Sequence, residues 1–316
     1  MADRSRMASL VYHAGALGDF ITTLPALRVW RRLHPTERII LLGKPRFASV
    51  AGRFAPWDEI WDVESARFAA LFRPASATSP RLSEPEREPG ELSFLSSALL
   101  FSPPSSPLRT NLRARGVRHI LWQAPFPSSA MPIIDYHLSI FPALEIPEEE
   151  RIPLVDKGEA PERSPSGDRG SSADRRPPRL PPVAIHPGSG NLSKNWPLER
   201  FKELAVELQR KGERVVWITG PAEEDVSLDP RDEVWRDLPL AILCANLSRS
   251  RLYVGNDSGI THLAAAAGAP TLALFCASDP RIWTPRGGLV RTLHGAEPSS
   301  IPLSAVLRDS RLLLGG

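Results

Sequence analysis

Short apolar runs alternate with amphipathic stretches along the first part of the chain. Ala8–His13 is an apolar run that predicts a strand, and a glycine-bearing loop, Ala14–Asp19, follows it. Apolar residues then recur at helical spacing over Phe20–Leu33, which predicts a helix. Further elements are expected as strands at Arg38–Leu42, Glu59–Val63 and Val117–Trp122, and as helices at Leu108–Arg115 and Tyr136–Leu144. This alternation predicts a parallel sheet covered by helices.

Two polar, proline-rich segments interrupt the pattern. Pro74–Gly90 predicts a loop, and Lys157–Pro182 predicts a linker because it offers almost nothing to bury. Alternation resumes after the linker, with strands expected at Val183–His186, Arg214–Thr219, Leu252–Val254 and Thr271–Phe275, and helices at Pro197–Lys211, Leu240–Ser248, Gly259–Gly268 and Leu303–Leu314. We therefore expect an N-terminal domain over residues 1–156, a linker over 157–182 and a C-terminal domain over 183–316.

Composition narrows the class of protein. The chain has 316 residues, of which 42% are hydrophobic and 24% charged, as in soluble globular proteins. The net charge of +3 is too small to indicate a nucleic-acid partner, although it permits an anionic one. Cys244 and Cys276 both lie in apolar contexts, which favours two buried thiols over a disulfide framework or a metal site. The apolar run near the N-terminus is interrupted by His13 and Asp19 and lacks the cleavage site of a signal peptide, so we expect a cytoplasmic protein.

The segment Gly255–His262 (GNDSGITH) places a polar turn between a predicted strand and a helix of small residues. Backbone N–H groups at such a helix start favour a phosphate group. Ser258 adds a hydroxyl, and Gly259 allows close approach of a ligand to the backbone. His262 lies one turn further on. The alternative is that Asp257 or Ser258 merely caps the helix and His262 is packed in the core.

A second polar loop, His186–Trp196 (HPGSGNLSKNW), also joins a predicted strand to a helix. Its lysine, Lys194, suits a contact with a diphosphate. The alternative is an ordinary loop with a solvated lysine. Because both loops follow strands of one expected sheet, both project from its carboxyl edge, and together they predict a nucleotide site there.

A third loop, Gly15–Asp19 (GALGD), follows the first strand. Asp19 stands at the expected helix start, where it either caps the helix or accepts a proton from an incoming hydroxyl. The glycine spacing matches neither the dinucleotide fingerprint nor the P-loop.

Four segments in this order resemble glycosyltransferase family 9, the bacterial heptosyltransferases: GALGDFITTLPAL, HPGSGNLSKNWPLERFKELAVEL, ITGPAEED and VGNDSGITHLAAAAGAPTLALFCASDPRIWTPRG. The resemblance implies an α/β chain with the GT-B fold, in which two Rossmann-like domains face a central cleft. It also implies metal-independent transfer of a sugar with inversion, typically heptose from ADP-heptose onto the lipopolysaccharide core. The nucleotide sugar is then a substrate, and no cofactor or metal is expected.

The resemblance also implies roles for individual residues. Asp19 corresponds to the general base, and Lys194 neutralises the leaving diphosphate. Donor-binding roles fall on Ser189, Gly190, Lys194, Glu224, Leu238, Asp257, Ser258, Gly259 and His262. Within that set, Asp257 meets sugar hydroxyls, Glu224 the ribose, and Leu238 lies beside the base. The acceptor side is expected at His13, Gly15 and Gly18.

Some features depart from the family pattern. Relatives often carry Lys or Arg where this chain has His13, and Pro74–Pro132 matches weakly. An alternative is therefore a nucleotide-sugar-binding protein that has lost transfer, or a member that uses another donor sugar. A Rossmann oxidoreductase is a weaker third reading, because no Gly-X-Gly-X-X-Gly is present. We expect a monomer whose acceptor is an oligosaccharide or lipid-linked, met by peripheral contact at the cytoplasmic face of the inner membrane.

Overall fold

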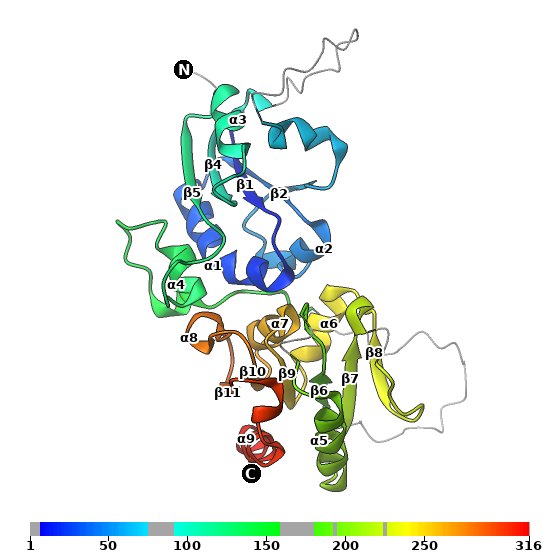
Figure 1. Ribbon diagram of the computed structural model, residues 1–316. Helices are drawn as coiled ribbons and strands as arrows, with labels where there is room; N and C mark the ends of the chain where they lie inside the picture. The colour runs from blue at the N-terminus through cyan, green and yellow to red at the C-terminus, as the bar shows by residue number, and fades with distance from the viewer. Residues whose placement is uncertain (1–6, 75–91, 159–179, 192–194, 224–225, 316) are drawn as a thin grey trace, which may run out of the picture. The chain divides into compact units, whose positions relative to one another are not determined.

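The computed structural model of the protein describes residues 7–74, 92–158, 180–191, 195–223 and 226–315. The chain divides into two compact units, Met1–Arg151 and Ile152–Gly316. Each unit is built on a parallel sheet with helices packed on it, as the alternating pattern predicted (Figure 1). The loop predicted at Pro74–Gly90 and most of the predicted linker, residues 157–182, lie outside the described residues.

The N-terminal unit contains a five-stranded sheet in the order β3-β2-β1-β4-β5, with every pair parallel. Its strands are β1 (Ala8–His13), β2 (Arg38–Gly43), β3 (Glu59–Asp62), β4 (Leu95–Phe101) and β5 (His119–Gln123). Its helices are α1 (Leu17–Leu33), α2 (Pro45–Ala48), α3 (Leu108–Ala114) and α4 (Ile133–Leu138). The central strands are buried on both faces, which is why they read as nearly continuous apolar runs.

Alternate residues of β1 serve the two faces of this sheet. Leu10 and Tyr12 join a buried cluster that includes Leu108 and Leu112 of α3. Ser9, which precedes Leu10 and faces the other side of the sheet, is also buried, and its Oγ accepts a hydrogen bond of 2.8 Å from Nε1 of Trp30 on α1. The helices α1 and α4 contact each other. This packing fixes α1, and with it the loop that follows β1.

The C-terminal unit contains a six-stranded sheet in the order β11-β10-β9-β6-β7-β8, again with every pair parallel. Its strands are β6 (Val183–His186), β7 (Val215–Thr219), β8 (Glu233–Arg236), β9 (Leu252–Asn256), β10 (Thr271–Phe275) and β11 (Val290–His294). Its helices are α5 (Leu198–Arg210), α6 (Leu240–Leu247), α7 (Gly259–Ala267), α8 (Pro280–Trp283) and α9 (Leu303–Leu314).

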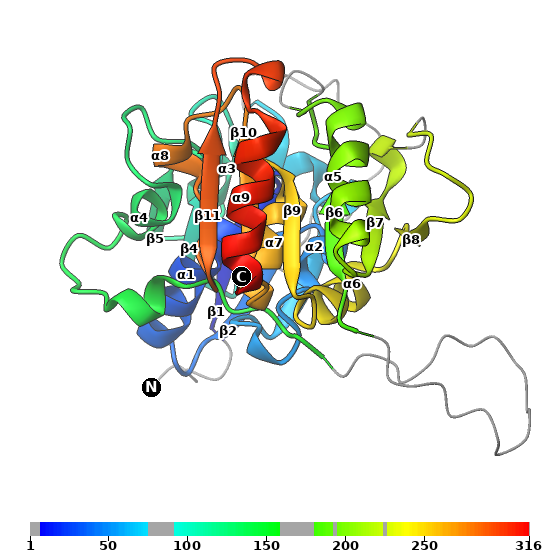
Figure 2. The ribbon, with the colours of Figure 1, turned by 90° about the horizontal axis from the view of Figure 1, so that it is seen from below.

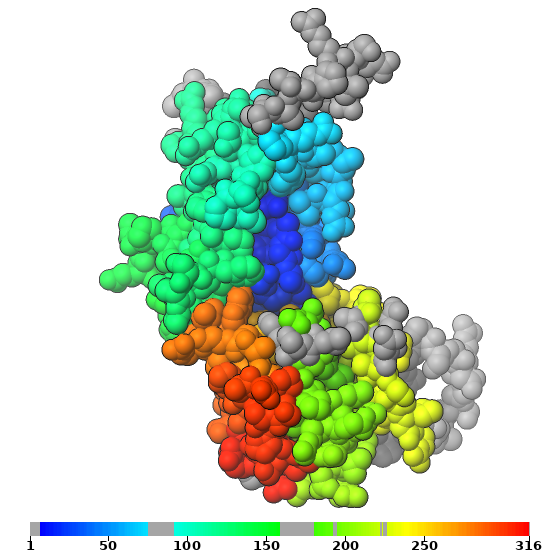
Figure 3. All heavy atoms as spheres, viewed as in Figure 1, coloured from blue at the N-terminus to red at the C-terminus, as the bar shows by residue number. Residues whose placement is uncertain are grey.

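Two helices, α5 and α9, lie side by side on one face of this sheet (Figure 2), and their outer surfaces are adjacent in Figure 3. The core beneath them includes the fully buried Trp196, Phe201 and Trp217. Trp196 packs edge-to-face on Phe201 at 4.9 Å between ring centroids, and its Nε1 donates to the carbonyl of Ile301. The helix α7 packs against β9 and β10 and contacts α6. Burial of these aromatic rings is a large apolar contribution to the stability of the unit.

Several predicted boundaries were wrong. Helix α1 begins at Leu17 instead of Phe20, so Gly18 and Asp19 lie in its first turn and not in the loop. Helix α4 spans Ile133–Leu138 instead of Tyr136–Leu144. Pro142 disfavours the helical conformation of the residue before it, so the helix ends ahead of this proline although the apolar pattern continues. The two edge strands, β8 and β11, were not expected.

Cys244 and Cys276 are free thiols and both are buried, as their apolar contexts predicted. Across the ranges that the structure describes, no helix is both long and apolar enough to cross a membrane.

Candidate functional site

The order of the strands creates a switch point in each sheet. From β6 the chain runs to β7 and β8 on one side, and β9 returns to the other side of β6. The loops that follow β6 and β9 therefore diverge, and such a divergence opens a crevice at the carboxyl ends of the strands where ligands bind. The two loops that the sequence assigned to a nucleotide site are these two. In the N-terminal unit the corresponding point lies between β1 and β4, and the loop after β1 is the one that leads to Asp19.

The loop after β9 leads directly into α7. Ser258 is the N-cap residue, and its Oγ accepts from the backbone N–H of Thr261 at 3.4 Å. Gly259 is the first helical residue, and His262, one turn along, is buried. The capping predicted as the alternative is therefore present. It is compatible with an anion site, because the first N–H groups of a helix have no acceptor within the helix.

Asp257 lies just before this cap and is 8% exposed. Its Oδ2 accepts a hydrogen bond from the hydroxyl of Ser278, which follows β10. Its backbone N–H donates to the carbonyl of Leu274 at 2.9 Å. The carboxylate is thus held at the sheet edge beside the cap of α7, in the position that sequence reasoning gave it.

The loop after β6 has a different character. The hydroxyl of Ser189 lies 2.8 Å from the carbonyl of Asn191 and 2.7 Å from Oδ1 of Asn195, so it is engaged within the loop. Gly190 is exposed. Lys194 lies outside the described residues.

One side chain that sequence reasoning missed joins the two loops. Asn256, the last residue of β9, is fully buried. Its Nδ2 donates to the carbonyl of Pro187 at 2.6 Å, and its Oδ1 accepts from the backbone N–H of Trp196 at 2.8 Å. Both ends of the loop after β6 are therefore anchored to the last residue of the strand that precedes Asp257 and Ser258. The only signal in the sequence was its place in the GNDSG segment.

A second missed group lies at the end of β7. Glu223 closes a 3₁₀ turn, Pro221–Glu223, and is buried together with His186 of β6. Glu223 Oε1 lies 3.6 Å from His186 Nε2, and Oε2 accepts from the Gly220 N–H at 2.8 Å. Burial alone raises the pKa of Glu223, but the hydrogen bond and charge of His186 and the Gly220 N–H outweigh it, so the pKa is lowered. The ribose contact was predicted one residue further on, at Glu224, which lies outside the described residues.

Leu238, predicted to lie beside the base, is half-buried between β8 and α6, at the same edge of the sheet.

In the N-terminal unit, Asp19 occupies the third position of α1. Its Oδ2 accepts from the N–H of Ala16, the residue that precedes the helix, at 3.0 Å. A methyl group at Gly15 would lie 2.9 Å from that same oxygen and 3.0 Å from Cε1 of His13. Gly15 therefore lets the carboxylate and the imidazole come close together, while Gly18 lies in the first turn, beside Asp19. The structure groups all four predicted residues at the end of β1.

His13 is a neutral base in this environment. Burial, followed by the charges of His137 and Lys44, lowers its pKa to about 3. Its ring packs against Phe20 and Phe101, and Phe101 also packs against His137, whose pKa burial lowers to about 4. His13 thus contributes a hydrogen-bonding nitrogen beside Asp19 and not the positive charge of a Lys or Arg.

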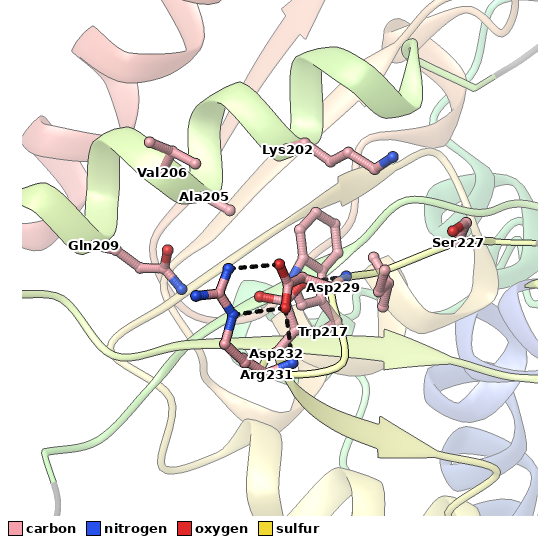
Figure 4. A pocket seen from close by; sticks show the side chains of 10 residues that line it. Lys202, Ala205, Val206, Gln209, Trp217, Ser227, Asp229, Arg231 and Asp232 are labelled. Atoms are coloured by element: carbon pink, nitrogen blue, oxygen red, sulfur yellow. Dashed lines mark hydrogen bonds and ion pairs between the residues drawn. The ribbon is translucent and has the colours of Figure 1, made fainter.

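A pocket of about 690 Å³ lies elsewhere in the C-terminal unit (Figure 4). Lys202 and Gln209 of α5 line one side, and Asp229 and Arg231, which form an ion pair, line the other. The described residues that line it include none of the predicted site residues. Within the same ranges, no group of three or more His, Cys, Asp or Glu side chains is arranged to hold a metal ion.

Residues 128–304 match the model of a family described as glycosyltransferase family 9 (heptosyltransferase), which is more than half of the chain. Lipopolysaccharide heptosyltransferase 3 of Escherichia coli (strain K12) is 29% identical over 115 residues. That alignment covers 33% of this chain and 33% of the relative, so the chain matches about a third of that protein's length.

Two solved structures are similar over nearly the whole chain. The glycosyl transferase family 9 protein from Veillonella parvula DSM 2008 is 17% identical, with a TM-score of 0.74, over 98% of this chain and 97% of that one. ADP-heptose lps heptosyltransferase II of E. coli is 16% identical, with a TM-score of 0.71, over 98% of both chains. These likenesses concern the fold, and together with the two parallel sheets they confirm the predicted GT-B fold.

A substitution at Gly188 tests how tightly Glu223 is packed at the carboxyl edge of the C-terminal sheet. A Cβ at this position would lie 1.8 Å from Glu223 Oε1 and 2.4 Å from its Cδ, whereas a Cβ at Gly190 would meet nothing within 4 Å. We expect Gly188→Ala to lower the free energy of unfolding by about 1–3 kcal/mol, the usual cost of overpacking. Gly190→Ala is the matched control and should leave it nearly unchanged. Equal urea denaturation curves for the two variants would contradict this geometry.

Removing the two hydrogen bonds of the Asn256 side chain should lower the free energy of unfolding by more than Gly188→Ala does. Asn256→Ala leaves the Pro187 carbonyl and the Trp196 N–H buried without their partner, and each such loss costs about 1–3 kcal/mol. Urea denaturation of the C-terminal unit, followed by tryptophan fluorescence, should show a clear loss of stability. A loss within experimental error would mean that water or a shifted loop replaces the amide.

The two buried histidines make the N-terminal unit sensitive to acid. Their folded-state pKa values lie below the unfolded value, so the unfolded state binds more protons between about pH 6.5 and 4, and stability falls as pH falls. For each histidine the loss from pH 7 to 5 is about 2 kcal/mol. His137→Asn should remove one such contribution, seen as a smaller difference between denaturation curves at pH 7 and pH 5. An unchanged difference would show that His137 is protonated in the folded unit.

Proposed function

This chain belongs to glycosyltransferase family 9, and we propose that it transfers a sugar from a nucleotide-linked donor to a glycan acceptor. ADP-heptose is the favoured donor, and the lipopolysaccharide core or a related surface glycan is the favoured acceptor. The names of the similar proteins support this choice, since one names ADP-heptose and both heptosyltransferases name lipopolysaccharide. The observation that carries the proposal is that two polar loops follow β6 and β9, the strands on either side of the switch point, and that the loop after β9 leads into the start of α7.

The donor diphosphate binds at the start of α7 in this proposal. The N–H groups of the first turn and the helix dipole attract the anion, and Ser258, Gly259 and His262 complete the contacts. Asp257, held by Ser278, hydrogen-bonds hydroxyls of the donor sugar. Ser189 and Gly190 of the other loop approach the diphosphate. Lys194, Glu224 and Leu238 keep the roles that the family resemblance gives them, at the diphosphate, the ribose and the base.

Asp19 acts as the general base. Its carboxylate takes the proton of the acceptor hydroxyl while that oxygen attacks the anomeric carbon, and the nucleoside diphosphate leaves from the opposite face. A single displacement of this kind inverts the anomeric centre. Lys194 and the dipole of α7 stabilise the charge of the leaving group, which is the work that a metal ion does in other transferases. The proposed reaction therefore needs no metal and no cofactor.

An acceptor linked to lipid has to be met at a membrane surface, so we infer peripheral contact of a cytoplasmic, monomeric enzyme with the inner membrane. The acceptor side lies around His13, Gly15 and Gly18 at the end of β1, beside Asp19.

Replacing Asp19 tests the role of the base. Asp19→Asn keeps the shape of the side chain but not its basicity, so turnover should fall about 10²–10⁴-fold while donor affinity stays the same. Asp62→Asn is the matched control, because Asp62 is an exposed carboxylate that ends β3 at the same edge of the sheet. Undiminished turnover in Asp19→Asn, or an equal loss in both variants, would remove Asp19 from the mechanism.

The proposed reaction is tested by incubating the protein with ADP-heptose and a truncated lipopolysaccharide core in the presence of EDTA. We expect product of one added heptose by mass spectrometry, with the anomeric configuration inverted by NMR. Transfer from another nucleotide sugar would keep the enzyme and change its donor. Nucleotide binding without transfer to any acceptor would favour the binding-protein alternative, and full inhibition by EDTA would refute metal independence.

A further inference from the structure

His186 and Glu223 are two buried titratable side chains that the proposed reaction does not use. Each is 4% exposed, and they come from different elements, the end of β6 and the turn after β7. Burying a charge is costly unless a partner compensates it, and here the imidazole and the carboxylate compensate each other. The pair lies at the same sheet edge as the start of α7.

The imidazole of His186 connects Glu223 to the cap of α7. Its Nε2 lies 3.6 Å from Glu223 Oε1, and its Nδ1 lies 3.4 Å from Ser258 Oγ. An imidazole with a proton on each nitrogen donates in both directions, to the carboxylate and to the hydroxyl. A carboxylate alone beside an anion site would repel the ligand, whereas a carboxylate paired with an imidazolium adds no net charge there.

The position of Glu223 is fixed from two sides. Its Oε2 accepts the Gly220 N–H at 2.8 Å, and the space that a side chain at residue 188 would need is filled by the Glu223 carboxylate. The lowered pKa of Glu223 is consistent with an ionised carboxylate facing His186. Its location therefore follows from the fold of the edge and not from a flexible side chain that happens to lie near.

The hydrogen bonds around Ser258 then decide where its proton points. Its oxygen accepts from the Thr261 N–H at 3.4 Å, and His186 Nδ1 lies at the same distance. In the proposed arrangement both imidazole nitrogens carry a proton, so that Nδ1 donates to Ser258 and both lone pairs of the hydroxyl are occupied. Thr261 Oγ1, 3.1 Å away, donates to the Asn256 carbonyl and accepts from the hydroxyl of Tyr253. The Ser258 hydrogen is thus the one proton of the group that can turn from Thr261 to a ligand.

We propose that Glu223, acting through His186, is a positioning residue that orients the Ser258 hydroxyl as a donor to the diphosphate of the nucleotide sugar. The inference rests on the proposed function, because it assumes that a nucleoside diphosphate binds at the start of α7. It assigns to this chain a positioning pair that is separate from the residues that touch the donor.

The test measures the affinity of the full-length protein for ADP and for adenosine by calorimetry. Glu223→Gln removes the charge and keeps the size, so ADP should bind about three- to tenfold more weakly, the change expected from one weakened hydrogen bond. Adenosine has no phosphate, and its affinity should not change. Glu213→Gln, which breaks the ion pair of Glu213 with Arg251 at the opposite edge of the sheet, is the matched control and should bind ADP as the wild type does.

A double-mutant cycle separates positioning from a general effect on the fold. In a Ser258→Ala background, Glu223→Gln should cause no further loss of ADP affinity, because the hydroxyl through which it acts is gone. If Glu223→Gln does not fold, Glu223→Asp, which keeps the charge with a shorter reach, replaces it and should weaken ADP binding while sparing adenosine.

The outcomes distinguish this inference from the function on which it rests. Wild-type protein that binds no nucleoside diphosphate overturns both. Wild-type protein that binds ADP, with Glu223→Gln binding it equally well or with independent losses in the two variants, overturns the positioning role alone. Parallel losses for ADP and adenosine would also overturn it, since they indicate a structural defect.

Discussion

The candidate donor site depends on one requirement, that each buried polar group at the β6 and β9 edge has a partner inside the protein. In the loop after β6, the Pro187 carbonyl and the Trp196 N–H both have the side chain of Asn256 as their partner. His186 and Glu223 are partners of each other. Because unpaired groups of this kind are expensive, the loops have little freedom to move independently. Pairing that stabilises the edge also gives the start of α7 a defined geometry before any ligand arrives.

Parallel topology brings these residues together. In both sheets, the first strand of the unit has a later strand on each side, because the chain builds one side of the sheet first and then returns to build the other. A switch point therefore forms beside β1 and beside β6. Asp19 follows the first of these strands and the HPGSG loop the second. In each unit, most of the candidate site residues therefore lie at the carboxyl ends of the central strands, and the outer strands extend the sheet on either side. Function lies in the loops, and the buried strands fix their positions.

Much of this arrangement could be predicted from the sequence. Central strands are apolar and short, and their loops carry glycine and polar residues, so the fold class and both loops of the candidate donor site could be predicted. The edge strands β8 and β11 were missed because they are half-exposed and carry charged residues. Glu223 and Asn256 were missed for another reason. Their contacts join segments distant in the chain, and no local pattern in the sequence distinguishes a buried Glu from an exposed one.

A crystal structure of the protein with ADP bound tests the central claim most directly. The account predicts the diphosphate at the start of α7, with a phosphate oxygen within hydrogen-bonding distance of Ser258 Oγ and of the first helical N–H groups. It also predicts the Ser258 hydroxyl still within reach of His186. ADP bound at another place on the chain, such as the pocket along α5, or a phosphate that does not contact the loop after β9, would contradict the account.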